Sequence, residues 1–207
     1  MNMIYVSFDI GVKNLALCVI RQSQETVTMV DWTIITLADN KKQIKGVNKI
    51  AEILYYELDN IIGKLGDIDI KYIDKVIIEN QPSNLNGIMK TIQYLLFSYF
   101  DLLRHWDKIV GEVILINPTQ KLQNHTYLPQ TIASPNTSRR DKYKINKQQS
   151  IEICKQYIMN DNSLHQIFLC HKKKDDLADT CLQTLSYIRK NGYNIDSITL
   201  DAVNCLL

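Results

Sequence analysis

Long apolar runs are missing from this 207-residue chain. The longest, such as residues 94–100 and 113–116, fall far short of the roughly 20 residues that a membrane-spanning helix needs, so the sequence predicts no transmembrane segment. The start of the chain also lacks a basic region ahead of its apolar stretch, which soon meets Asp9 and Lys13. A signal peptide has such a basic region and carries no charges in its apolar stretch. We therefore expect an intracellular protein.

Cysteine pairs and zinc-finger spacings are missing as well. The five cysteines are scattered, with no C-x-x-C pair, and the four histidines share no ligand spacing. We interpret the cysteines as reduced thiols and none of the histidines as a metal ligand. A strong net charge is also absent, because +2 is too small to indicate a nucleic-acid partner by itself.

The composition is that of an ordinary globular protein, with 45% hydrophobic and 22% charged residues. The length suits one compact domain over residues 1–207. Three β-rich segments open the chain and predict an antiparallel meander, at residues 4–9, 15–20 and 27–36. Helices and apolar strands then alternate, as helix 47–65, strand 75–79, helix 86–104, strand 112–116, and helices 146–159 and 176–190. This order predicts an α/β fold with a mixed sheet.

Positive charge gathers in one stretch of the chain. Residues 117–149 hold six Lys or Arg against one acid, Asp141, a local excess of +5. Three prolines and many Ser, Thr and Asn residues in the same stretch predict a long polar loop at about 117–145. Such a loop suits phosphate contacts, and a solvated basic linker is the alternative interpretation.

Two acidic residues stand at the ends of apolar strands. Asp9 closes the segment 4–9 and Glu79 closes the segment 75–79, whose core Val-Ile-Ile indicates a buried central strand. A buried carboxylate is costly unless it is paired or binds a cation. The alternative for Asp9 is a turn aspartate that accepts backbone N–H bonds before Gly11.

A third acidic group opens the last predicted helix. Asp176 and Asp179 are three residues apart and therefore share one helix face, while Asp175 precedes them. Taken alone, this group also suits an N-cap and the positive end of the helix dipole. If Asp9, Glu79 and the two helical carboxylates converge, the chemistry that needs such a concentration of negative charge is binding of hard divalent cations. A pair of Mg²⁺ ions there would suit phosphodiester cleavage.

Three motifs in this order resemble the RuvC-type Holliday junction resolvases, within them the branch of poxviruses and other large DNA viruses. They are DIG (9–11) with NLA (14–16), IENQP (78–82) with MKTIQ (89–93), and KDDLAD (174–179). The resemblance extends from about residue 3 to residue 190. It implies an RNase H-like fold over residues 1–207, with a mixed five-stranded sheet of an antiparallel three-strand meander plus two parallel strands, flanked by helices.

The resemblance also implies an activity. Such a protein is a homodimeric, Mg²⁺-dependent endodeoxyribonuclease, with two metal ions per site and Mn²⁺ as a substitute, that makes paired symmetric nicks in four-way DNA junctions. It needs no nucleotide cofactor and no membrane, and it acts where viral DNA is replicated, which for the poxvirus-like branch is the host cytoplasm. A two-fold symmetric dimer presents the same site to two opposed strands of the junction. Part of the apolar helix 86–104 is a candidate dimer interface, and burial within the domain is the alternative.

The resemblance assigns roles to particular residues. The four metal-binding acids are Asp9, Glu79, Asp176 and Asp179. We select Lys147, with Lys144 as the alternative, as the basic residue beside the scissile phosphate. The candidate DNA-binding residues are Lys13, Asn80, Gln81, Lys90, Arg139, Arg140, Lys142, Lys144, Lys147 and Lys174.

Two other functions stay open on the sequence. One is an RNase H-fold nuclease that acts on other branched DNA or on RNA–DNA hybrids, because the metal site does not choose the nucleic acid. The other is a non-catalytic junction-binding module, for which the loss of a carboxylate would be expected. All four carboxylates are present.

Overall fold

A single mixed β-sheet forms the centre of the structure, a computed structural model that describes residues 2–38, 46–82, 87–127 and 137–201. Its strands are β1 (Met3–Asp9), β2 (Leu15–Gln22), β3 (Val27–Ile35), β4 (Ile73–Glu79), β5 (Val110–Ile116) and β6 (Thr199–Leu200). The strand order across the sheet is β5-β4-β1-β2-β3-β6. β1, β2 and β3 pair antiparallel, whereas β4 is parallel to β1 and β5 is parallel to β4. This confirms the predicted meander and two parallel strands, to which β6 adds a short sixth strand parallel to β3.

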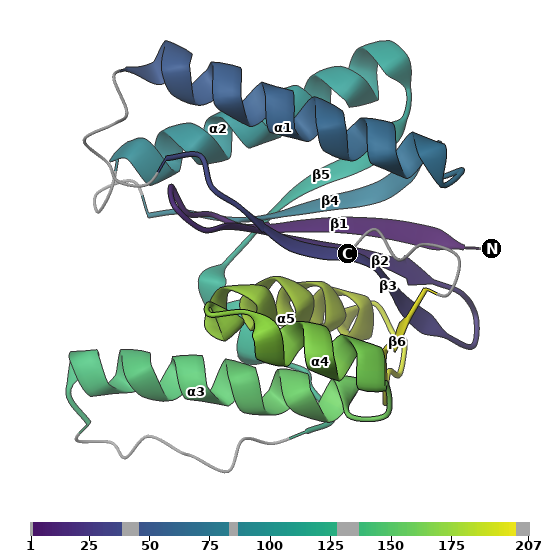
Figure 1. Cartoon of the computed structure of the whole chain (residues 1–207), viewed down its shortest axis with the longest axis vertical. Coiled ribbons are helices and arrows are strands. Elements are labelled where there is room, and N and C mark those ends of the chain that lie inside the picture. Colours follow the sequence, from purple (N-terminus) through teal and green to yellow (C-terminus); the bar gives the residue numbers. More distant parts are fainter. Residues whose placement is uncertain (1, 39–45, 83–86, 128–136, 202–207) are drawn as a thin grey trace.

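Helices cover both faces of the sheet (Figure 1). α1 (Val47–Asp67) and α2 (Gly87–Leu102) lie on one face, and α3 (Arg139–Ile158), α4 (Asn162–Cys170) and α5 (Lys174–Lys190) lie on the other. Alternate side chains of the strands point to opposite faces, so Phe8 packs in the core beneath α1 and α2 while Tyr5 packs in the core beneath α5. Burial on both faces explains why the central strands are continuously apolar.

Helix α3 begins earlier than the sequence predicts. The predicted helix 146–159 starts at Arg139 in the structure, so part of the expected basic loop 117–145 is helical. Ser138 caps this helix, because its hydroxyl accepts a hydrogen bond from the backbone N–H of Asp141 at 3.2 Å. Among the first seven residues of the helix only Tyr143 and Ile145 are apolar, and these two do not form an apolar stripe that would have marked the segment as helix. Residues 128–136 of the expected loop lie outside the described residues.

Three more elements were not predicted. They are α4, the strand β6 and the 3₁₀ helix η3 (Pro118–Leu122), which follows β5. The helix α2 also ends in a π-helical turn, η2 (Leu103–Asp107), where the sequence predicts α-helix to residue 104. Each of these elements is short, and short segments give too few turns or alternations for a periodic pattern.

Cys18, Cys154 and Cys181 are buried free thiols and Cys170 is an exposed one, while Cys205 lies outside the described residues. In the part of the chain that the structure describes, no helix is both long and apolar enough to cross a membrane.

Trp32 of β3 ties the sheet to the start of α5. Its ring stacks on Phe168 of α4 with centroids 5.2 Å apart, and its Nε1 donates to the carbonyl oxygen of Leu177 at 3.0 Å.

Trp32→Phe is expected to lower the free energy of unfolding by about 2–3 kcal/mol, because it removes the buried hydrogen bond and part of a packed ring. Urea denaturation measures this loss. Trp106→Phe is the matched control, since Trp106 is 78% exposed; equal losses in the two variants would contradict the anchoring role.

Candidate active site

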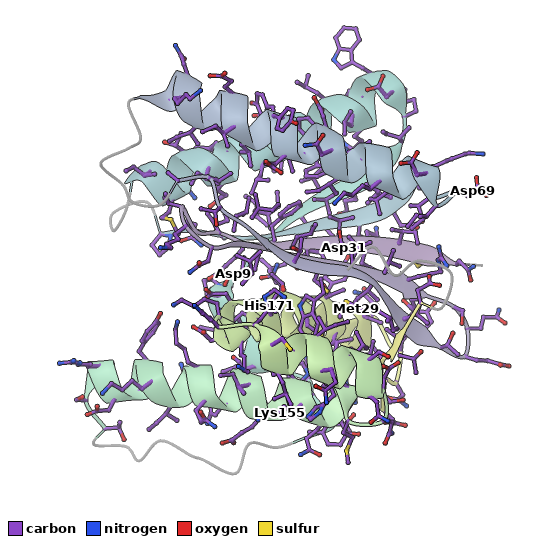
Figure 2. All side chains as sticks on the ribbon, in the orientation of Figure 1. Asp9, Met29, Asp31, Asp69, Lys155 and His171 are labelled. Atoms are coloured by element: carbon purple, nitrogen blue, oxygen red, sulfur yellow. The ribbon has the colours of Figure 1, made fainter. Side chains whose placement is uncertain are left out.

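The carboxyl ends of β1 and β4 place two acids side by side. The parallel register pairs Phe8 with Ile78, so Asp9 and Glu79, the next residues of the two strands, are neighbours at the same edge. The two carboxyl groups are close enough for Glu79 to raise the pKa of Asp9. Figure 2 shows Asp9 where the sheet meets the layer of α3, α4 and α5. The sheet topology therefore brings together two carboxylates that are 70 residues apart in sequence.

The start of α5 brings two more carboxylates to this edge. Asp176 and Asp179 line the same cavity as Asp9 and Glu79, which has a volume of about 470 Å³. α5 is held on the sheet by Gln183, whose buried amide Nε2 donates to the Ser7 hydroxyl at 2.9 Å. Because Gln183 lies one helical turn beyond Asp179, this bond fixes the acids relative to β1. The four acids predicted from the sequence thus converge from three elements.

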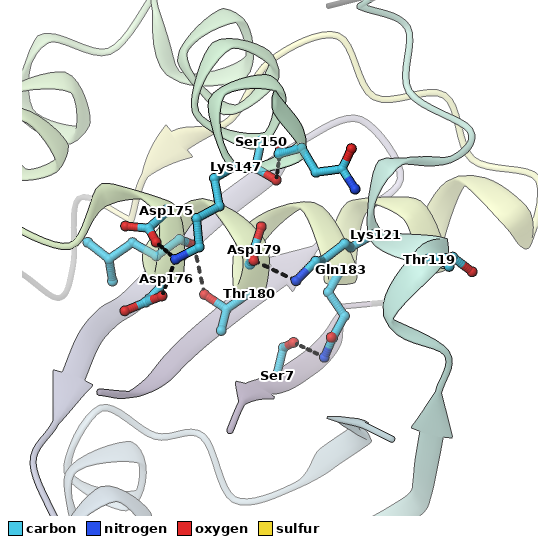
Figure 3. A network of polar contacts seen from close by, with 12 residues as sticks. Ser7, Thr119, Lys121, Lys147, Ser150, Asp175, Asp176, Asp179, Thr180 and Gln183 are labelled. Atoms are coloured by element: carbon cyan, nitrogen blue, oxygen red, sulfur yellow. Dashed lines mark hydrogen bonds and ion pairs between the residues drawn. The ribbon is translucent and has the colours of Figure 1, made fainter. Parts of the chain in front are cut away.

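Two lysines enter the cavity among these acids (Figure 3). Lys121 of η3 has its Nζ 2.5 Å from Asp179 Oδ2. Lys147 of α3 bonds to Asp175 and lies 3.9 Å from Asp176 Oδ1. The Lys147 ammonium also lies over the ring of Tyr143, 5.1 Å from its centroid. Positive charge on η3 and α3 therefore faces negative charge on the strand ends and α5.

The environment raises the pKa of three of the acids in the cavity. Burial, together with the neighbouring Glu79, raises the pKa of Asp9 well above its usual value. Burial also raises the pKa of Asp179, although Lys121 opposes the shift. Asp176 has its pKa raised to about 6 by burial and by the nearby charges of Asp175 and Asp9. These raised values come chiefly from burial of the carboxylates, and repulsion between neighbouring acids adds to them.

Asp175 behaves differently from the other acids. Burial opposes its ionisation, but the bond to Lys147 outweighs burial and holds the pKa of Asp175 below its usual value. The pKa of each cavity lysine is instead raised by its acidic neighbours. Burial favours the neutral amine of Lys121, yet Asp179, Asp9 and Glu79 raise its pKa above the usual value. Burial likewise opposes the charge of Lys147, and its bond to Asp175 raises its pKa above the usual value, so both lysines are charged at neutral pH.

The donor set fits hard divalent cations. Asp179 Oδ1 is buried, and nothing in the described residues hydrogen-bonds to it. An unpaired buried carboxylate oxygen is costly, and a cation would satisfy it. Among residues 2–38, 46–82, 87–127 and 137–201, no group of three His, Cys, Asp or Glu side chains is arranged closely enough to hold a metal ion as the side chains stand. Lys121 and Lys147 supply the positive charge in this arrangement.

Of the remaining predicted residues, one lines the cavity and the others that the structure describes lie outside its lining. Gln81 lines it. Lys90 of α2 holds the two residues that follow β4, because its Nζ donates to Asn80 Oδ1 at 3.1 Å and to the Gln81 carbonyl oxygen at 2.9 Å. Lys174 donates to the carbonyl oxygen of His171 at 2.8 Å. The others are exposed and do not line the cavity, namely Lys13, Arg140, Lys142 and Lys144, and the side chain of Arg139 lies outside the described part.

Sequence reasoning missed Lys121 as a site residue. It counts only as one of the basic residues in 117–149, and no periodicity distinguishes it. The signal that was present is its position five residues after the apolar strand β5, just beyond Asn117-Pro118, at the sheet edge that carries Asp9 and Glu79. Asn117 caps η3 by accepting from Thr119 N at 3.0 Å, and this turn directs Lys121 into the cavity.

Comparison with known proteins identifies the family. The family described as "Poxvirus A22 protein" matches residues 3–191. This chain belongs to the poxvirus A22 family. Protein L451 of Acanthamoeba polyphaga mimivirus, described as uncharacterized, is 33% identical over 137 residues, which are 62% of this A22-family chain and 33% of L451. The chain spans about a third of the length of this curated relative.

Solved structures share the fold of this A22-family protein. The yeast mitochondrial Holliday junction resolvase Ydc2 matches with a TM-score of 0.59 and 14% identity over 89% of this chain and 78% of Ydc2. The fowlpox virus Holliday junction resolvase matches with a TM-score of 0.57 and 21% identity over 91% and 99% of the two chains. Thermus thermophilus RuvC in complex with a Holliday junction substrate matches with a TM-score of 0.53 and 9% identity over 91% and 96%. These matches confirm the RuvC-like fold that the sequence predicts.

Proposed function

We propose that this A22-family protein is a Holliday junction resolvase, an endodeoxyribonuclease that makes paired symmetric nicks in four-way DNA junctions. The observation that carries the proposal is the convergence of four carboxylates and two lysines in one cavity at the sheet edge. Concentrated carboxylates suit divalent cations, and lysines beside them suit a phosphate backbone. The family membership and the shared fold of three named resolvases support the choice of a junction as substrate.

The four acids hold the metal in this proposal. Asp9, Glu79, Asp176 and Asp179 would bind two Mg²⁺ ions, with Mn²⁺ as a substitute. When bound, such ions activate water and stabilise the leaving oxygen of a phosphodiester. The chain's own contribution is to keep the carboxylates together despite their repulsion, and to offer the unpaired Asp179 Oδ1 as a ligand.

The two lysines serve the phosphate. Lys147, which the sequence selects, and Lys121 both carry an ammonium group into the cavity. Each is paired with an aspartate in the free protein, so it is held in place rather than moving with solvent. A positioned cation stabilises the charge that develops on a phosphate in the transition state. We assign this role to Lys147 and place Lys121 between the phosphate and Asp179.

Junction DNA would run along the basic side chains around the cavity. The exposed Lys142 and Lys144 lie on the first turns of α3, and Lys13 follows β1. Asn80 and Gln81, held by Lys90, would face the centre of the junction. A dimer formed through α2, which exposes Tyr94 and Leu102, would present two cavities to opposed strands. Residues 1–207 would then act as one nuclease domain, in the host cytoplasm where viral DNA is replicated.

A substrate panel tests this function. Equal amounts of a labelled four-way junction, a linear duplex of the same sequence and an RNA–DNA hybrid are incubated with the protein and Mg²⁺, or with EDTA. We expect cleavage of the junction only, and none in EDTA. Equal cleavage of the duplex or preference for the hybrid would favour a nuclease of other specificity. Tight junction binding without cleavage under any metal would favour a binding module.

The raised pKa of Asp176 predicts a stability effect in the metal-free protein. A folded-state pKa of about 6, above the usual value of 3.8, means that Asp176 lowers the stability of the fold progressively as the pH rises from about 4 to 6, and that the loss is complete above pH 6. Asp176→Asn is therefore expected to raise Tm in EDTA at pH 7.5 by a few degrees, since 1 kcal/mol shifts Tm by about 2–4 °C at this size. The gain should shrink as the pH falls through 6 and disappear near pH 4.

Measurement of Tm by thermal unfolding at pH 7.5 and at pH 4 checks this effect. Asp67→Asn is the control, because Asp67 is exposed at the end of α1 and its substitution should leave Tm unchanged at each pH. A lower Tm for Asp176→Asn at pH 7.5 would show that the charge of Asp176 stabilises the fold, contrary to the repulsion inferred for the cavity.

A further inference from the structure

The short helix η3, which carries Lys121, is held from outside by side chains of α5. The Ser186 hydroxyl donates to the carbonyl oxygen of Gln120 at 2.7 Å. Arg189 donates to the carbonyl oxygen of Asn124, just beyond the end of η3. A 3₁₀ helix of five residues has too few internal hydrogen bonds to fix its own position. The position of η3 therefore depends on these neighbours.

A histidine completes this support at Lys121 itself. His125 Nε2 lies 2.7 Å from the carbonyl oxygen of Lys121, and His125 Nδ1 lies 3.2 Å from the hydroxyl of Tyr157 on α3. A carbonyl oxygen only accepts, so Nε2 carries the proton and donates. Burial, with a contribution from Arg189, lowers the pKa of His125 and keeps the ring neutral, although the bond to Lys121 opposes this shift.

Hydrogen bonds link His125 to Tyr157, and Tyr157 to the backbone of the next residue, Thr126. In the neutral ring, Nδ1 accepts from the Tyr157 hydroxyl, and the same hydroxyl oxygen accepts from the backbone N–H of Thr126 at 3.2 Å. Tyr157 is fully buried in the core beneath α5, and its ring packs against His125 with centroids 5.7 Å apart. A rigid core side chain thus fixes the imidazole, and the imidazole fixes the backbone of Lys121.

His125 does not belong to the cavity itself. It is not among the residues that line it, whereas Lys121 is. Its influence on the cavity must therefore pass through Lys121, whose Nζ lies 2.5 Å from Asp179. A misplacement of about 1 Å at a reacting centre costs on the order of 100-fold in rate, so a loosened η3 would be felt in the chemistry.

We propose that His125, fixed by Tyr157, is a positioning residue that holds Lys121 against Asp179 in the cavity. This inference rests on the proposed function for its effect on nicking, but its structural part concerns Lys121 alone. It assigns a role to a histidine that sequence reasoning set aside and that carries no ligand spacing.

Three variants test the proposal on nicking of a four-way junction. His125→Leu removes both hydrogen bonds and is expected to slow nicking about 10–100-fold without changing the Kd for the junction. His125→Gln keeps an amide donor near the position of Nε2 and should recover most of the rate. Tyr157→Phe removes only the hydroxyl that fixes the ring and should give an intermediate loss. Equal nicking rates for His125→Leu and His125→Gln would overturn the proposal.

A double variant separates positioning from a general loss of structure. In a Lys121→Ala background, His125→Leu should cause no further loss of nicking, because the group that it positions is already gone. A merely structural histidine would slow the Lys121→Ala protein by the same factor as the wild type. That result would contradict the proposal.

A second readout does not depend on nuclease activity. Acylation of lysines by an amine-reactive reagent, followed by mass spectrometry, should label Lys121 slowly in the wild type, because only 18% of its side chain is exposed. In His125→Leu the rate should rise several-fold, while the exposed Lys144 serves as the internal reference. An unchanged rate at Lys121 overturns the proposal. A raised rate in a protein that nicks no junction supports the positioning role and rejects the proposed function.

Discussion

Asp179→Asn is expected to slow nicking of a four-way junction by about 10³-fold at saturating Mg²⁺. Asp179 offers the cavity a buried carboxylate oxygen that lacks a partner in the described residues, and an amide cannot replace its charge as a cation ligand. Loss of one such ligand removes several kcal/mol of transition-state stabilisation, and each 1.36 kcal/mol is a factor of ten in rate. Single-turnover cleavage of a labelled junction measures the change.

Binding and stability should survive this substitution. The Kd for the junction should stay within a few-fold of the wild type, because basic side chains outside the acid cluster carry the phosphate contacts. Tm should change little, because burial disfavours the charge of Asp179 while its ion pair with Lys121 favours it. Asp141→Asn is the control, because Asp141 is exposed on α3 and lies outside the cavity lining. Equal nicking by Asp179→Asn and the wild type would remove this acid from the metal site.

Lys147→Met is expected to slow nicking about 100-fold. The ammonium of Lys147 lies between Asp175 and Asp176 at the rim of the acid cluster, and it is the positive group that we place beside the scissile phosphate. Methionine keeps most of the volume of the side chain and removes the charge. The effect should appear in the rate of a single turnover more than in Kd, because one phosphate contact among many contributes little to binding.

Lys144→Met is the matched control for this lysine. Lys144 stands three residues earlier on the same helix and is exposed, and its Nζ lies 3.9 Å from Asp141 Oδ1. Its substitution should weaken junction binding slightly, reduce the salt dependence of Kd, and leave the single-turnover rate near that of the wild type. A larger rate loss in Lys144→Met than in Lys147→Met would reverse the choice between the two lysines.

The strand framework and the four acids were accessible from the sequence for one physical reason. A buried strand must be apolar, so an acid at its end, such as Asp9 or Glu79, stands out against the run before it. On α5, the three-residue step between Asp176 and Asp179 defines a helix face without any knowledge of the fold. Burial dictates the first pattern and helix geometry the second, and both can be read without knowledge of the tertiary contacts.

The features that escaped prediction depend on contacts between distant segments. Lys121 enters the cavity only because β5 lies beside β4 in the sheet, and nothing near it in sequence shows this. His125 acquires its role from Tyr157, which is 32 residues away on α3. The first turns of α3 lack an apolar stripe, and the Ser138 cap stabilises the start of this helix. Periodicity detects core faces, and none of these features lies on one.

Mapping the nicks on a four-way junction, with each strand labelled in turn, tests most directly whether the acid cavity makes this A22-family protein a resolvase. With Mg²⁺ we predict single nicks at symmetric positions on two opposed strands, and ligatable products. The same pattern should be absent in EDTA and in Asp179→Asn. Nicks at unrelated positions on all four strands, or a symmetric pattern that persists in Asp179→Asn, would contradict the proposed site.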